Sequence, residues 1–227
     1  MTSIFQRALG ADFDRLHPRL QRRFGIASTD GLACVGTGVM DRVWRGKAFT
    51  VPFLIAGTQR HVLFPDRGEQ IPFTIENYPY LDRYGRETLT FVRTFEFPGA
   101  RRRRFDATMV YSPRRRQLVD YLGTHQHLAV DLRLSVDDRG GLRIDTGEQR
   151  FREGRADFRL PGALSGSAQV HEWYDEELDR FRIEVRVAHR RFGPLFGYHG
   201  TFTTAEVDLR AAPVPAAVKP AREELRD

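Results

Sequence analysis

Arg93 is the first residue whose position suggests chemistry, because it falls on the apolar face of a candidate strand. In the alternating segment Leu89–Phe97, Arg93 shares its face with leucine and phenylalanine, while threonines and a glutamate share the other face. A buried guanidinium without a partner costs several kcal/mol, so Arg93 needs a carboxylate or an anionic ligand. Two readings stay open. One is a buried ion pair with Glu76 on the preceding hairpin strand, and the other is a pocket cation that orients a carboxylate, phosphate or enolate oxygen.

Asp120, Tyr198 and His199 are the candidate catalytic residues. Asp120 lies between two leucines on an apolar strand face, and Tyr198 and His199 lie between glycines, where the backbone can approach another segment or a ligand closely. A pocket that combines a histidine with a carboxylate provides a general acid and base, with Tyr198 or Tyr121 as hydrogen-bond donor. The alternative is a structural hydrogen-bond network at a barrel rim.

The candidate substrate-binding residues come from several segments. The cluster 171–175 combines aromatic and ionisable side chains, which recognise polar groups of ligands in pockets. We expect substrate contacts from Glu76, Arg93, Tyr121, His171 and Trp173. The sequence contains neither a Gly-x-Ser-x-Gly nor a Gly-x-x-x-x-Gly-Lys motif, so acyl-enzyme and nucleotide hydrolysis are disfavoured.

His125 and His127 form a His-x-His pair. On a strand, this spacing places both imidazoles on one face, as in metal sites built on β-barrels. Extending the alternation of 128–136 backward puts Gln126 with the buried set and both histidines on the polar face, whereas a bulge near Gly123 would reverse this. We therefore predict that these histidines bind no metal, and we expect no cofactor. The alternative is a metal site with His125 and His127 as ligands.

The elements that must position these side chains are strands. From Leu32 onward the dominant period is two, which indicates strands with one buried face, and it is clearest in 128–136 and 181–189. Turn-forming sequences such as Asp138–Gly141 join neighbouring strands, which is typical of sequential hairpins. About ten strands in one domain predict a mainly β fold, an antiparallel meander that forms a closed or nearly closed β-barrel, since closure removes exposed edges. A two-sheet sandwich is the alternative.

The chain ends and one internal segment depart from the strand pattern. Residues 3–25 carry apolar side chains three and four apart and predict short helices. Residues 45–67 interrupt the strands and are expected to form a short apolar helix or flap across one end. We expect one β-rich domain over residues 1–210, followed by a disordered tail, 211–227, which is rich in Ala, Pro and charge.

Five short segments carry a family resemblance: Pro72–Asn77, Tyr84–Thr88, Arg104–Met109, Asp120–His127 and Phe196–Gly200. They closely resemble an uncharacterised bacterial domain family, in which the module stands alone or follows a saccharopine-dehydrogenase-like redox domain. The resemblance implies a single domain and, by analogy with the fused relatives, a redox enzyme that handles small metabolites as a partner. The chain itself carries no Gly-x-Gly-x-x-Gly sequence for binding a dinucleotide.

Composition restricts the partners. The chain of 227 residues has 36 Lys and Arg against 30 Asp and Glu, a formal net charge of +6. The arginine runs 101–104 and 114–116 lie at opposite ends of one strand, on the order of 40 Å apart, so they form no continuous groove for nucleic acid. The longest apolar run, 51–56, is far shorter than the roughly 20 residues of a membrane span. Because Cys34 is the only cysteine, we expect a cytoplasmic protein without an internal disulfide. From the spacing of the arginine runs and the short apolar run, we expect it to bind neither nucleic acid nor membrane.

Together these features predict a protein that binds a small hydrophobic or amphipathic metabolite in a β-barrel cavity. A cofactor-independent proton-transfer, cyclisation or isomerisation step is the expected extension of binding. The alternative is a non-catalytic interaction module that docks on a redox partner enzyme.

Overall fold

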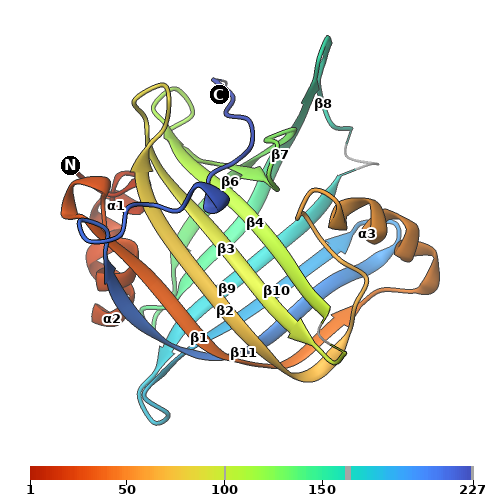
Figure 1. Ribbon diagram of the computed structural model, residues 1–227, viewed down its shortest axis with the longest axis horizontal. Helices are drawn as coiled ribbons and strands as arrows, with labels where there is room; N and C mark the ends of the chain where they lie inside the picture. Colours follow the sequence, from red (N-terminus) through yellow and green to blue (C-terminus); the bar gives the residue numbers. More distant parts are fainter. Residues whose placement is uncertain (100, 162–164, 226–227) are drawn as a thin grey trace.

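The computed structural model describes residues 1–99, 101–161 and 165–225, which form one antiparallel sheet of eleven strands (Figure 1). The strands are β1 Leu32–Arg45, β2 Gly68–Leu81, β3 Glu87–Phe97, β4 Arg101–Ser112, β5 Gln117–Leu122, β6 Leu128–Val136, β7 Leu142–Glu153, β8 Ala156–Arg159, β9 Gly166–Asp175, β10 Arg180–His189 and β11 Gly193–Asp208. The α-helices are α1 Ile4–Leu9, α2 Pro18–Phe24 and α3 Val51–Thr58, and the 3₁₀ helices are η1 Gly10–Arg15, η2 Ser28–Asp30, η3 Ala48–Thr50 and η4 Ala216–Val218.

Ten of these strands close into a barrel. From β1 to β7 each strand pairs with the next, β9 pairs with β7 and β10, and β11 pairs with both β10 and β1, which completes the ring. The remaining strand, β8, extends from β7 as a short hairpin (Figure 1). This closed meander with short N-terminal helices confirms the predicted fold class and excludes the two-sheet sandwich.

Alternation along each strand fills the barrel with apolar side chains. In β10, Phe181, Ile183 and Val185 are buried in the core, whereas Arg182 and Glu184 between them are not. Gly38 on β1 allows the closest approach of two strands in this wall. A Cβ atom added there would lie 2.0 Å from the carbonyl oxygen of Thr201, so the register of β1 with β11 depends on a glycine.

Helices cover the two ends of the barrel (Figure 1). At one end, the Ser3 hydroxyl accepts from the backbone of Gln6 to cap α1 and donates to the Phe24 carbonyl, which ties α1 to α2. The ring of Phe5 then packs 4.6 Å from that of Phe24. At the other end, α3 and the segment after it bury Leu54 and Phe64 in the core, so the expected apolar helix across one end is present.

The C-terminal segment, which the sequence predicts to be disordered, lies along the outer wall of the barrel. Val218 is 7% exposed and packs with Ala33, Tyr78 and Val92, and the Ala221 amide donates to a backbone carbonyl of the β5–β6 loop. An apolar strip on the outer wall therefore holds the part of the tail that the structure describes. Among the described residues, the helices are too short or too polar to cross a membrane.

Candidate functional site

Four ionisable side chains point into the barrel and form what we call the interior polar cluster: Arg93 of β3, Asp120 of β5, Glu172 of β9 and Tyr198 of β11. All are buried, with exposed fractions of 6%, 7%, 3% and 0%. Burial raises the pKa values of the other three, and the charge of Arg93 opposes each rise, so the guanidinium acts on all three groups. Strands distant in sequence thus place these four groups inside the barrel.

Arg93 lies between aromatic rings. Its guanidinium carbon is 5.2 Å from the ring centroid of Phe91 and 4.9 Å from that of Phe105, distances at which a cation is attracted to a ring face. Within the residues that the structure describes, its Nε and Nη1 atoms have no hydrogen-bond partner. The cation is held in place by the rings, and its donors are available for an oxygen atom.

Asp120 has an unusual proton affinity for a carboxyl group. Burial raises its pKa to about 7, although the nearby Arg93 charge opposes that rise. Its Oδ1 atom has no hydrogen-bond partner among the described residues. Near neutral pH both the acid and the carboxylate are populated, which is the condition for a group that gives and takes protons.

Tyr198 stays protonated under the same conditions. Burial raises the pKa of its hydroxyl to about 12, with Arg93 opposing the rise. Its ring packs 5.1 Å from that of Phe95, and its hydroxyl lies close enough to Arg93 to feel it as a hydrogen-bond donor, without a completed hydrogen bond in the described part of the chain. Arg93 and Tyr198 together therefore offer donors to a negatively polarised oxygen, with Asp120 as the neighbouring proton carrier.

Arg23 extends this cluster to the mouth of the barrel. Its Nε donates to Glu172 Oε1 at 2.7 Å, and its Nη1 donates to Cys34 Sγ at 3.3 Å. Burial raises the pKa of Glu172, and Arg23 opposes that rise. Neither Arg23 nor Cys34 could be recognised as a site residue from the sequence, since nothing local shows that α2 lies over the barrel mouth. Alternation along β9 could have identified Glu172 as inward-facing.

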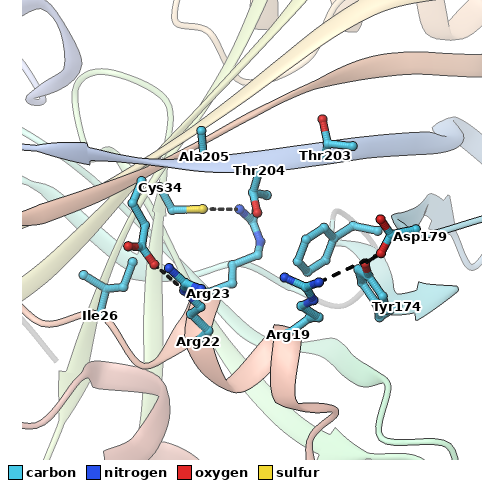
Figure 2. A pocket seen from close by; sticks show the side chains of 12 residues that line it. Arg19, Arg22, Arg23, Ile26, Cys34, Tyr174, Asp179, Thr203, Thr204 and Ala205 are labelled. Atoms are coloured by element: carbon cyan, nitrogen blue, oxygen red, sulfur yellow. Dashed lines mark hydrogen bonds and ion pairs between the residues drawn. The ribbon is translucent and has the colours of Figure 1, made fainter. Parts of the chain in front are cut away.

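A pocket of about 310 Å³ opens beside this ion pair, and we call it the α2 pocket (Figure 2). Arg19, Arg22 and Arg23 of α2 form one side, and β10 and β11 form the other. Ile26, Cys34, Tyr174 of β9 and Asp179 before β10 complete the lining. This pocket is more polar than the hydrophobic cavity expected from the sequence, and it lies at the mouth of the barrel.

Glu76 lies on the outer wall, so it cannot form the ion pair with Arg93 that the sequence left open. In the β2–β3 register, Arg93 is opposite Ile75, and Glu76 is opposite Val92 on the other face. The Tyr78 hydroxyl donates to Glu76 at 3.2 Å. The error has a simple cause, since a step of one residue along a strand reverses the face.

The other predicted site residues also lie outside the barrel. His171 bonds to Asp137 at 2.7 Å and stacks on Trp173 with centroids 4.5 Å apart. His199 follows the inward-facing Tyr198 and is 3.6 Å from Asp41. Trp173 and His199 do meet, in an outer depression of about 210 Å³. The structure thus turns both Asp120 and Tyr198 toward the barrel interior and places His199 outside it.

Tyr121 is buried on the face of β5 that points away from the barrel interior. It is 0% exposed and packs with Val110, Val119 and Ala129, and its hydroxyl interacts with Arg86. Its neighbour Asp120 faces the interior, so the two side chains cannot contribute to one pocket.

His125 and His127 lie in the loop between β5 and β6, with their rings stacked 5.5 Å apart. His127 bonds to Arg60 at 2.5 Å and pairs with Glu153. Gln126 between them is buried, but it lies in the loop with a φ of +53° and accepts a hydrogen bond from the Glu224 amide, so strand alternation does not account for its burial. In the described ranges, no group of three or more His, Cys, Asp or Glu side chains is arranged to hold a metal ion.

Comparisons with known proteins agree with the resemblance found in the sequence. Residues 16–202 match the family model described as Domain of unknown function (DUF4166). The chain is 32% identical over 206 residues to the uncharacterised protein YndH of Bacillus subtilis (strain 168), an alignment that covers 91% of this chain and 98% of the relative. No solved structure matches the chain significantly. The chain therefore belongs to the DUF4166 family of domains of unknown function.

Proposed function

We propose that the barrel binds a small amphipathic molecule through a carbonyl or carboxylate oxygen, which Arg93 and Tyr198 receive as hydrogen-bond donors. The observation that carries this proposal is the pairing state of the interior polar cluster. Arg93, Asp120 and Tyr198 are each more than nine-tenths buried, and each keeps a polar atom that no other described residue satisfies. Buried polar groups in proteins are normally paired, so three incompletely paired groups inside one barrel support a ligand site.

The surroundings favour a molecule with an apolar body. Phe91 and Phe105 flank Arg93, and Phe95 packs on Tyr198. A ligand oxygen would meet the donors in an environment of low dielectric constant, where a charge-assisted hydrogen bond is stronger than in water.

Asp120 supports an extension from binding to proton transfer. As carboxylate, it would take a proton from the carbon next to a ligand carbonyl, and the C–H electron pair would move toward the carbonyl oxygen at Arg93 and Tyr198. Returning the same proton to another carbon restores the carboxylate and isomerises the ligand, with no cofactor.

A thermal-shift screen against fatty acids, oxo acids and polyketide-like ketones tests binding. We expect at least one class to stabilise the wild-type protein and to lose that effect in Arg93→Met and Tyr198→Phe. The matched control is Arg102→Met, since Arg102 lies on the outer wall with 72% of its side chain exposed. A screen without stabilisation, or stabilisation retained in Arg93→Met, contradicts the proposal. Hydrogen–deuterium exchange into a bound ketone, lost in Asp120→Asn, tests the proton-transfer step.

The second candidate is docking on a redox partner enzyme, and an apolar surface at the α3 end of the barrel supports it. Phe49 and Phe192 are both 47% exposed with centroids 5.4 Å apart, and Ile55 is 53% exposed. Titration with a saccharopine-dehydrogenase-like enzyme by calorimetry tests this candidate. We expect binding that is lost in the double variant Phe49→Ser/Phe192→Ser, and the absence of heat with wild-type protein would reject it.

A further inference from the structure

The α2 pocket has a charged side and an apolar floor. Figure 2 shows Arg23 rising from α2 toward Cys34, while Arg22 and Arg19 stand nearer the rim. Ile26 and Phe181 supply apolar surface in the same pocket. With a volume of about 310 Å³, it lies at the small end of the range for ligand pockets. Its shape and lining suit a short amphipathic molecule.

Arg23 is fixed before any ligand arrives. Only 1% of its side chain is exposed, and its Nε and Nη1 atoms are bonded to Glu172 and Cys34. A guanidinium has five N–H donors in a rigid plane, so holding one edge orients the other. Its Nη2 atom is buried and has no hydrogen-bond partner in residues 1–99, 101–161 and 165–225. The remaining donors of Arg23 are thus pre-oriented for an acceptor in the pocket.

The rim pairs hold their arginines more loosely. Arg22 donates to Glu206 at 2.5 Å, and Arg19 lies 4.0 Å from Asp179. The side chains of Arg22 and Arg19 are 67% and 54% exposed. Exposed ion pairs contribute little to stability, so an incoming carboxylate can replace a rim carboxylate at small cost.

We propose that the α2 pocket is a binding site for a small monocarboxylate with a short apolar chain. The carboxylate accepts from Arg23 Nη2 and from Arg22, and the chain lies against Ile26 and Phe181. A single buried donor edge beside apolar surface matches a carboxylate better than inorganic phosphate, which is more highly charged and has no apolar part. This site meets the interior polar cluster at Glu172 but takes its donors from Arg23 and Arg22, so it does not rest on the proposed function.

Octanoate is the probe, measured by calorimetry and thermal shift on the full chain, with octanol and inorganic phosphate as comparison ligands. We expect saturable binding of octanoate and at least about tenfold weaker binding of the other two, because octanol lacks the charge and phosphate lacks the chain. Tighter binding of phosphate than of octanoate overturns the carboxylate assignment.

Two variants locate the site. Arg23→Met alone would leave Glu172 buried and uncompensated, so we combine it with Glu172→Met, which removes the pair together. Ile26→Trp fills the pocket and leaves Arg23 in place. Both variants are expected to weaken octanoate at least about tenfold, whereas Arg102→Met is expected to bind like the wild type.

Arg93→Met separates this proposal from the proposed function. Octanoate binding that persists in Arg93→Met and is lost in the two pocket variants supports the α2 pocket. Binding that needs Arg93 but survives in the pocket variants overturns this inference and supports the interior site instead. Failure of wild-type protein to bind octanoate overturns this inference and leaves the wider ligand screen to decide the function.

Discussion

Asp120→Asn should change how the stability of the barrel depends on pH. Burial raises the pKa of Asp120 from 3.8 to about 7, with Arg93 opposing the rise, so the folded protein holds this proton more tightly than the unfolded chain does. The stabilisation is complete below pH 3.8 and is lost as the pH rises to about 7. A shift of about 3 pH units, at about 1.4 kcal/mol per unit, makes the full effect about 4 kcal/mol. Asparagine resembles the protonated form and does not titrate.

Urea unfolding of wild type and Asp120→Asn between pH 5 and pH 8.5, followed by tryptophan fluorescence, measures this difference. In this window the wild type should lose about 3 kcal/mol relative to the variant, because the first part of the titration lies below pH 5. Other titrating groups cancel in the difference between the two proteins unless they interact with Asp120. Asp138→Asn, a change at an exposed turn position, is the control and should give a flat difference.

Two results would refute this reasoning. A difference that does not change with pH would mean that Asp120 titrates near its ordinary value. A variant that is less stable than wild type throughout, most of all at high pH, would mean that Arg93 and Asp120 form a net stabilising ion pair. Either outcome would remove Asp120 as a proton carrier at neutral pH.

Three further substitutions test the packing and the faces of the barrel by urea unfolding. Phe95→Ala should cost about 3–5 kcal/mol, since the ring is 0% exposed and contacts other core aromatics, and a cost below about 1 kcal/mol would contradict this packing. Gly38→Ala should prevent stable folding because its Cβ would overlap the Thr201 carbonyl, whereas Gly147→Ala, with 3.4 Å of clearance, should be tolerated. His199→Ala should change stability by less than about 0.5 kcal/mol and leave any ligand-induced thermal shift intact, and loss of that shift would return His199 to the site.

The barrel was predictable from the sequence because alternation records which face of a strand is buried. Hairpin turns also make consecutive strands pair with each other, which explains why β1 to β7 lie in the sheet in chain order. Closure was harder to predict. The pairing of β1 with β11 joins residues about as far apart as the chain allows, and no local pattern distinguishes that pairing from two open sheets.

The candidate site was predictable only where a single strand carries the information. Arg93 and Asp120 are polar residues on apolar faces, and each can be recognised from its own strand. Glu76 was wrongly predicted to pair with Arg93 because the sequence does not fix which residue of β2 lies opposite Arg93. A difference of one residue in that register moves Glu76 to the other face of the sheet. Arg23 belongs to a helix whose place over the barrel mouth is a tertiary property, so its contacts with Glu172 and Cys34 could not be read from α2.

The two buried arginines differ in how far the fold itself satisfies their hydrogen-bond donors. Arg23 bonds to Glu172 and Cys34, so two of its nitrogens are satisfied inside the fold and it ties α2 to the barrel. Arg93 lies between the rings of Phe91 and Phe105, and its charge also acts on Asp120, Glu172 and Tyr198, yet its Nε and Nη1 atoms are unsatisfied within the described residues. A buried donor without an acceptor costs about 1–3 kcal/mol, and an apolar side chain of similar size would avoid that cost. The fold therefore accounts for two nitrogens of Arg23 and leaves its Nη2 for a ligand, whereas Arg93 keeps two unpaired nitrogens inside the barrel that a ligand oxygen would satisfy.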